Sequence, residues 1–350
     1  MNLSRPHKVY KICAFVFKIE IEAKEEKKSQ LPIGITNMIK KYISKNNIKE
    51  QLNSSMKDKI YRFIMADGMI KGAIIHSTQM INEMRANHEI GPLETLILGQ
   101  AYIAVSLICS GLKGKNDRIS MTIQCSGPIK GLDVEANVFG EVRGYLKTQS
   151  IEVENSEKIN GLAALFGAGF LTVTQYLENA STPYSGQVAL EYDSIAENLA
   201  NYFLVSEQNP TAFILSLFFD DKEEVKGAGG IFIQAMPGVE TAKVIEAEKM
   251  IHEIDSLGEF FSKGQTPEEI ILNKFSSFEP KLLNNSRVEF FCRCSKDRMK
   301  GYLNNLPKEE KKDMLKNGPF PVEIRCHHCN TLYLFSEEDL MTLEPREAIG

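Results

Sequence analysis

The residues of this chain whose types and spacing could do chemistry are four cysteines near its C-terminal end. Cys292 and Cys294 form a C-x-C pair, and after thirty-one intervening residues Cys326 and Cys329 form a C-x-x-C pair. Each pair of thiolates can present two sulfurs to one ion, and four sulfurs complete the tetrahedral shell that zinc prefers. The pattern therefore predicts one zinc ion per chain, with no open position for a reacting water.

The C-x-C half departs from a zinc ribbon, which has C-x-x-C on both sides. Its sulfurs stand on alternate residues and can close into a small, strained disulfide ring, which forms when the oxidant is strong and reopens readily. Ser295 is expected to cap a helix whose positive end favours the thiolate of Cys294. We interpret His327 and His328 as residues of the turn rather than replacement ligands, because four cysteines are already present.

The other three cysteines stand alone in the sequence. Cys13, Cys109 and Cys125 bring the total to seven. An odd total with four thiols clustered in two pairs fits a reducing compartment with a metal site better than a secreted disulfide framework. Because Cys109 and Cys125 lie in apolar patterns, we expect them to be unreactive core thiols.

Composition excludes some classes of function. The chain has 350 residues and a formal net charge of -5, with a pI near 5.8, so it offers no global attraction for nucleic acid. We find no apolar run approaching the eighteen or so residues needed to cross a membrane, and no good signal-peptide core. These features predict a soluble, mildly acidic protein long enough for two or three domains.

The first 55 residues differ in character from the rest. Over residues 1–60, thirteen Lys and Arg face six Asp and Glu, a net charge of about +7 that is opposite in sign to the whole chain. We interpret residues 1–55 as a disordered or weakly helical extension, or as the result of a start site placed upstream of a natural start near Met56.

Residues 56–238 have the pattern of an α+β domain with a mostly antiparallel sheet and packed helices. An apolar run without proline predicts a buried helix at 93–107, and helical spacing predicts another at 194–204. Alternating or short apolar runs predict strands at 119–124, 134–138, 171–175, 187–190, 213–219 and 230–236.

Residues 239–287 are predicted to form an amphipathic helical linker. Apolar residues recur there at three- and four-residue spacing, and Thr266, Pro267 and Glu269 form a capping box that starts a further helix. The apolar faces need a neighbour, and their candidate contact residues are Met250, Ile254, Leu257, Phe261, Ile271 and Phe275.

Residues 288–350 are predicted to form a small α+β zinc-binding domain. Helices are expected after Ser295 and near Pro307, and a short strand at 332–335. A unit of about sixty residues has too little core to be securely stable alone, so its fold should depend on the metal.

The cysteine arrangement, lying at the C-terminal end after a helical linker, resembles that of the heat-shock protein 33 family of redox-regulated chaperones. The resemblance extends over roughly residues 56–345. It is carried upstream by Gly127-Pro128, Ala136-Asn137, Arg143-Gly144-Tyr145, the run from Gly167 to Thr174, Tyr184-Ser185-Gly186, the run from Tyr202 to Thr211, and the run from Gly229 to Pro237.

The resemblance implies a cytoplasmic, ATP-independent holdase rather than an enzyme, with no catalytic residues. In such a protein the reduced, zinc-bound form is inactive. Oxidation would pair Cys292 with Cys294 and Cys326 with Cys329, release zinc, unfold the zinc domain and linker, and allow unfolding client proteins to bind, often to a homodimer. The six apolar linker residues named above would then be candidate contacts for the client. The extension of about 55 residues departs from the family pattern.

Two other functions compete with this interpretation. A zinc-ribbon protein that binds nucleic acid would carry a basic stripe, whereas residues 288–340 hold nine Lys and Arg against nine Asp and Glu. A dithiol oxidoreductase using Cys326 and Cys329 would have its C-x-x-C at the start of a helix in a thioredoxin-like βαβ pattern, whereas the residues after Cys329 are predicted to be extended.

Overall fold

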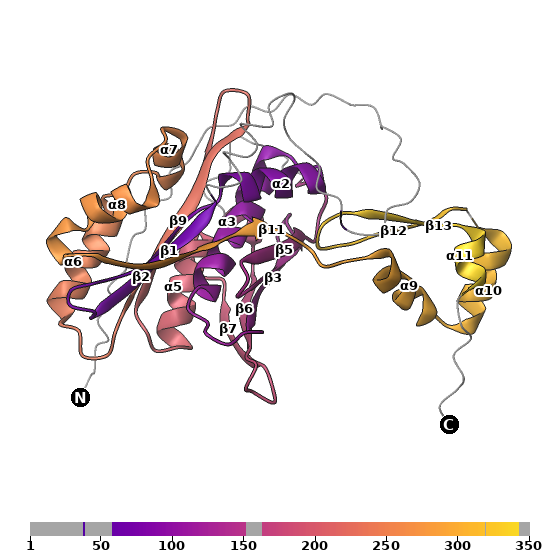
Figure 1. Cartoon of the computed structure of the whole chain (residues 1–350), viewed down its shortest axis with the longest axis horizontal. Coiled ribbons are helices and arrows are strands. Elements are labelled where there is room, and N and C mark those ends of the chain that lie inside the picture. The colour runs from indigo at the N-terminus through magenta and orange to yellow at the C-terminus, as the bar shows by residue number, and fades with distance from the viewer. Residues whose placement is uncertain (1–37, 39–57, 152–162, 319, 343–350) are drawn as a thin grey trace.

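The computed structural model describes residue 38 and residues 58–151, 163–318 and 320–342. Two large sheets, a helical connector and a small C-terminal group of elements follow one another along these ranges (Figure 1). The predicted extension 1–55 lies outside the described residues except for Met38, as does Cys13. The α+β fold class predicted from the sequence is confirmed.

The first sheet has five antiparallel strands in the order β10-β1-β2-β9-β8. The strands are β1 (Lys59–Met65), β2 (Ile70–His76), β8 (Thr211–Phe219), β9 (Val225–Ala235) and β10 (Lys281–Arg287). The predicted strands 213–219 and 230–236 correspond to β8 and β9. Strands β8 and β10 form the two edges, so each has one neighbour in the sheet.

The second sheet has six strands in the order β11-β5-β4-β3-β6-β7, all antiparallel except the short parallel pair of β11 with β5. The strands are β3 (Arg118–Cys125), β4 (Gly131–Asn137), β5 (Glu141–Leu146), β6 (Gly169–Tyr176), β7 (Tyr184–Ala189) and β11 (Glu289–Phe290). Buried and partly exposed residues alternate along β3 and β5, as a sheet with one face on the core requires. The strands predicted at 119–124, 134–138, 171–175 and 187–190 correspond to β3, β4, β6 and β7.

Helix α3 packs against strands of both sheets and forms the centre of the core. The helices of this part are α2 (Thr78–His88), α3 (Pro92–Cys109), α4 (Ala163–Phe166) and α5 (Ile195–Val205). By length and composition α3 could cross a membrane, and 78% of its 18-residue window is buried inside the protein. The expectation that no apolar run approaches that length was wrong, because scattered polar residues such as Gln100 do not lower the average enough.

The connector, which lies between β9 and the C-terminal elements, is helical only as far as Phe278. It consists of α6 (Thr241–His252), α7 (Leu257–Ser262), α8 (Pro267–Lys274) and the single turn η2 (Ser276–Phe278). Thr266 and Glu269 form the predicted capping box at the start of α8. The prediction of a helical linker up to residue 287 was wrong for residues 281–287, which form the edge strand β10. Pro280 cannot continue a helix, and β10 carries no apolar alternation that would have revealed it.

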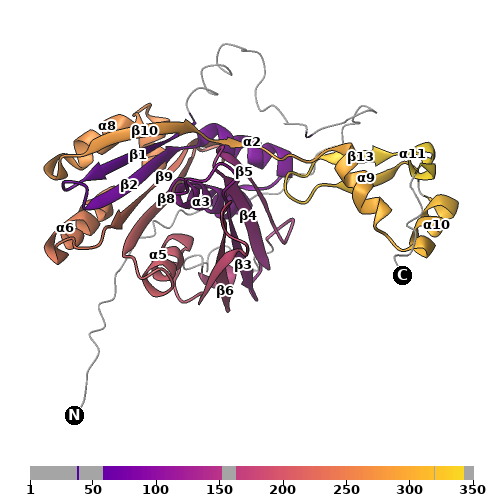
Figure 2. The same cartoon turned by 60° about the horizontal axis from the view of Figure 1, so that its bottom comes forward.

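The C-terminal elements extend away from the two sheets, on the far side of β11 from the connector helices (Figures 1 and 2). They are α9 (Lys296–Asn304), α10 (Lys308–Asn317), β12 (Val322–Arg325), β13 (Leu332–Phe335) and α11 (Glu337–Met341). As predicted, Ser295 caps α9, a helix follows Pro307, and residues 332–335 form a strand.

The turn between β4 and β5 contains Gly140 and lies close to the backbone at the end of β10. A substitution at Gly140 tests whether this close approach is needed. Its φ is 78°, and a β-carbon there would overlap the carbonyl oxygen of Arg287. We expect Gly140→Ala to lower the free energy of unfolding by about 3 kcal/mol, from left-handed strain plus overlap. Gly68→Ala is the control, because Gly68 has a φ of 84° with open space around it and should lose about 1–2 kcal/mol. Equal losses in urea denaturation would contradict the close approach.

Candidate metal centre

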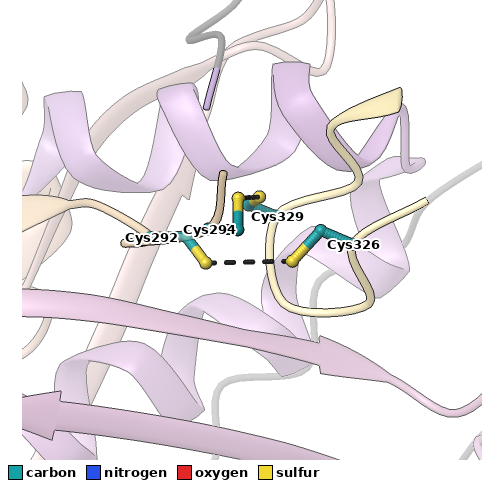
Figure 3. A group of neighbouring side chains, drawn as sticks. All are labelled: Cys292, Cys294, Cys326 and Cys329. Atoms are coloured by element: carbon teal, nitrogen blue, oxygen red, sulfur yellow. Dashed lines mark hydrogen bonds between the residues drawn. The ribbon is translucent and has the colours of Figure 1, made fainter. Parts of the chain in front are cut away.

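The structure brings the four predicted cysteines together from two separate loops. Cys292 and Cys294 lie between β11 and α9, and Cys326 and Cys329 lie in the turn between β12 and β13. All four side chains are buried, and their Sγ atoms lie within 4.8 Å of one another (Figure 3). Within the described part of the chain, this is the group of metal-ligating side chains that could hold an ion.

The second loop is folded tightly by its own backbone. The carbonyl oxygen of Cys326 accepts hydrogen bonds from the backbone N–H of Cys329, at 3.3 Å, and of Asn330, at 2.7 Å. Asn330 has a φ of 54°, a left-handed conformation that asparagine tolerates better than most residues. The turn therefore directs both thiols of the pair toward the same point.

The sulfur positions fit a tetrahedral zinc site. The Sγ atoms of Cys292 and Cys326 are 3.8 Å apart, and those of Cys294 and Cys329 are 3.3 Å apart. Four sulfurs around zinc at about 2.3 Å would be separated by about 3.8 Å. Four soft donors in a closed shell suit a structural zinc ion and leave no position for an activated water.

The charges of the thiols explain why such a group needs a cation. Hydrogen bonds from Cys294, and then from Cys326 and Cys329, hold the pKa of Cys292 far below its usual range. The neighbouring Cys292 raises the pKa of both Cys326 and Cys329, because a second negative charge would lie beside the first. A bound divalent cation removes this conflict by attracting every thiolate at once.

Three side chains that the sequence reasoning did not assign to the site contact its sulfurs. The hydroxyl of Tyr333 donates to Sγ of Cys294 at 3.0 Å, and Nη1 of Arg143 lies 3.7 Å from Sγ of Cys292. Thr331 Oγ1 lies 3.3 Å from Sγ of Cys329. The Arg143-Gly144-Tyr145 motif was visible in the sequence, but no sequence pattern placed Arg143 beside Cys292, which lies 149 positions further along the chain.

The cysteine loops are also fastened to the core. The side chain of Asn87, near the end of α2, donates to the carbonyl oxygen of Cys329 at 3.2 Å, and Asn330 returns a bond to the carbonyl oxygen of Asn87 at 3.0 Å. The backbone N–H of Gly144 donates to the carbonyl oxygen of His328 at 3.3 Å. The cysteines belong to the same apolar cluster as the residues around α3. The four-cysteine group therefore lies where the C-terminal elements join the core.

A buried histidine lies at this joint. Burial lowers the pKa of His88 to about 4, so its ring is neutral at pH 7. The ring lies 6.1 Å from that of Phe290, the last residue of β11. The rings of His327 and His328 both lie 5.5 Å from that of Tyr145, outside the group of four thiols.

The remaining cysteines differ from one another. Cys109 is buried, and burial raises its pKa to about 12, so it is the unreactive core thiol that was predicted. Cys125 is only partly buried, although burial raises its pKa as well. The prediction of an unreactive core thiol therefore holds only in part for Cys125, which ends β3 and packs against the main apolar cluster without being fully buried.

The candidate linker residues lie in a second apolar cluster, away from the cysteines. Ile254, Leu257, Phe261, Ile271 and Phe275 are buried there, and Met250 is half-buried against them. Their partners in this cluster come from β1, β2 and β9, so the connector covers one face of the five-stranded sheet.

We expect the reduced protein to hold one zinc ion per chain, with four sulfurs at about 2.3 Å in X-ray absorption. Cys326→Ser should lower the zinc affinity by more than about 100-fold, because it removes a ligand rather than a supporting contact. Cys125→Ser is the matched control and should leave the affinity unchanged. Nitrogen or oxygen ligands in the first shell would contradict the assignment, as would an unchanged affinity of Cys326→Ser.

Known proteins resemble this chain over the residues just described. A family model described as "Hsp33 protein" matches residues 58–336. The 33 kDa chaperonin of Agathobacter rectalis is 34% identical over 286 residues, covering 81% of this chain and 99% of the relative, and that of Lachnoclostridium phytofermentans is 32% identical over 292 residues, covering 83% and 99%. The crystal structure of the 33 kDa chaperonin from Thermotoga maritima matches with a TM-score of 0.74 and 32% identity, covering 82% of this chain and 97% of that one. The chain belongs to the Hsp33 protein family.

Proposed function

We propose that this protein is a redox-regulated, ATP-independent holdase that binds unfolding proteins once its cysteines are oxidised and its zinc is released. Family membership supports a chaperone role. The observation that carries the redox part is the position of the four thiols, which join the C-terminal elements to the core and would lose their shared ion on oxidation.

The surface that oxidation would uncover is the face of the five-stranded sheet beneath the connector. Its side chains are apolar and are buried under α6, α7 and α8; those contributed by the sheet are Phe63, Met65, Ile70, Ile74, Ile231 and Ile233. We call this set the platform. A contiguous apolar face of this kind is suited to holding an unfolded chain, because unfolded chains expose apolar side chains without a fixed shape.

The chemistry of the proposed switch is a pair of two-electron oxidations. In each, two thiolates give up two electrons to form a disulfide, and hydrogen peroxide takes up these electrons and two protons to become two water molecules. We propose that Cys292 pairs with Cys294 and Cys326 with Cys329. Zinc then leaves because a disulfide sulfur no longer carries the negative charge that binds it.

The loss of zinc has a large energetic effect on the C-terminal elements. A structural zinc ion contributes on the order of 10–16 kcal/mol to the folding of small zinc domains, more than such a domain holds in reserve. The C-terminal elements should therefore unfold, and β10 and β11 connect them directly to the connector. We propose that the connector follows, exposing both the platform and its own apolar faces.

The proposed cellular location follows from the need to keep the four thiols reduced. Four free thiols that act as a switch require a compartment that keeps them reduced until oxidant rises, so we propose a cytoplasmic location. We also propose that the oxidised form is a homodimer, as the resemblance to the family implies.

We expect the reduced protein to leave the aggregation of a thermally unfolding client unchanged, and peroxide under mildly unfolding conditions to turn suppression on without ATP. Light scattering measures the effect, with zinc release and thiol loss followed in the same sample. Cys125→Ser is the control and should be activated like the wild type. Equal suppression in dithiothreitol and after oxidation would count decisively against the proposal.

We expect Ile254→Asp and Phe261→Asp to loosen the connector while zinc remains bound, giving partial activity in reductant. Each change removes burial worth roughly 1.5–3 kcal/mol and places an unpaired charge on the platform. Leu272→Asp is the matched control, because Leu272 is on α8 and 48% exposed. Hydrogen exchange across residues 240–287 is the direct measurement. Protection that persists there after oxidation and zinc loss would show that the connector is not part of the switch.

A further inference from the structure

Strand β10 is held in the sheet almost entirely by its backbone. It pairs with β1 from Lys59–Arg287 to Ile64–Lys281, with an irregularity in the register after Arg62. None of its seven side chains is buried, and Leu283 is 58% exposed. A side-chain hydrogen bond between the strands, from Nη1 of Arg62 to Oδ1 of Asn284 at 3.0 Å, is exposed to solvent. A strand that buries so little has a low local stability.

The apolar groups that hold β10 in place lie beyond its two ends. On one side Phe278 is buried in the connector cluster, and its carbonyl oxygen accepts from the backbone N–H of Ala66. On the other side Val288 and Phe290 are buried in the main cluster, next to the cysteine loops. Figure 2 shows β10 lying along β1 and continuing to the C-terminal elements. Phe278 thus belongs to the connector, which the proposed function unfolds, and Val288 and Phe290 directly precede the cysteine loop that would lose its ion.

Release of β10 would leave β1 as an open sheet edge beside the platform. The backbone groups of Lys59–Ile64 that now face β10 would lose their partners. Tyr61, Phe63 and Met65 alternate along β1 and contact the connector, so they would flank this edge on the uncovered face. An unpaired edge next to apolar side chains is a template for another extended chain.

We propose that oxidation displaces β10, and that the vacated edge of β1 takes up an extended apolar segment of the client as an added strand. The inference rests on the proposed function and names the surface that would do the holding. Backbone hydrogen bonds between β1 and the client would make binding independent of the client's sequence. Every second side chain of the client segment, where apolar, would pack against the platform.

The sequence of β10 explains why a client segment could replace it. Directly opposite Tyr61, β10 has Asn285, and opposite Phe63 it has Leu282, which is 40% exposed. Residues opposite one another in an antiparallel pair point to the same face of the sheet. A client segment with an apolar residue in place of Asn285 would therefore bury more apolar surface against β1 than β10 does.

The first test is hydrogen exchange of the β1 amides in the full chain. In the zinc-bound reduced protein, the amides of residues 59–64 that face β10 should be protected. After oxidation they should exchange at least 10-fold faster, while the amides that face β2 stay protected. Unchanged protection at every β1 amide after oxidation would overturn the inference, because β10 would then remain in place.

The second test uses two probe peptides on the oxidised full chain. One is a ten-residue peptide of alternating valine and threonine, and the other has the same side chains with its internal backbone nitrogens methylated, so that neither edge can donate. Fluorescence anisotropy should give at least 10-fold weaker binding for the methylated peptide. The unmodified peptide should restore protection at residues 59–64. Equal binding of the two peptides, or protection restored only at the other edge strand β8, would overturn the inference.

Two controls separate the possible failures. If the oxidised sample suppresses client aggregation while β1 stays protected, the inference fails and the proposed function stands. If oxidation produces no suppression of aggregation, both fail. If β1 is protected after oxidation without peptide, and this protection rises with protein concentration, a second copy of the chain occupies the edge and the client does not.

Discussion

Four sulfur atoms that lie within 4.8 Å of one another cannot all carry a negative charge unless a cation lies between them. The pKa shifts of the cysteines reflect this constraint, because the pKa of Cys292 is lowered and the pKa values of Cys326 and Cys329 are raised by the neighbouring Cys292. The loops that carry these cysteines also fasten the C-terminal elements to α2 and β5. An ion bound to the four sulfurs would therefore also stabilise the folded elements that follow β11.

One continuous stretch of chain links the cysteine loops to the connector, so a change at the four sulfurs can affect both parts. The connector helices and the cysteine loops bury different apolar clusters, and the short stretch from β10 to β11 joins them. Strand β10 contributes backbone hydrogen bonds but no buried side chain, so it adds little that could hold one cluster in place once the other is lost. Gly140 and Asp58 are two of the points where the core touches this stretch. The turn at Gly140 approaches the carbonyl oxygen of Arg287, and the carbonyl oxygen of Asp58 accepts from the backbone N–H of Val288.

The sequence predicted the parts of this arrangement that depend on local pattern. The capping residues Ser295 and Thr266 fixed the starts of α9 and α8, alternation revealed β3 and β6, and the cysteine spacing revealed the ligand group. It did not predict β10, because a strand whose side chains are all at least partly exposed carries no apolar period. It also missed Asn87, Arg143 and Tyr333 at the cysteines, since a contact between residues far apart in the chain is set by the packing of the sheets.

The residues around α3 and the residues beneath the connector form two separate apolar clusters. Helix α3 is almost entirely buried between the two sheets, and its main contacts are with strands of both sheets and with α2 and α5. Tyr102 of α3 donates to the carbonyl oxygen of Gly144 at 2.9 Å, on the strand that also receives the cysteine loop. Loss of the loop would therefore expose one side of β5, while α3 would still hold that strand from the other side. The burial of α3 between the sheets therefore gives the six-stranded sheet an anchor that does not come from the cysteine loop.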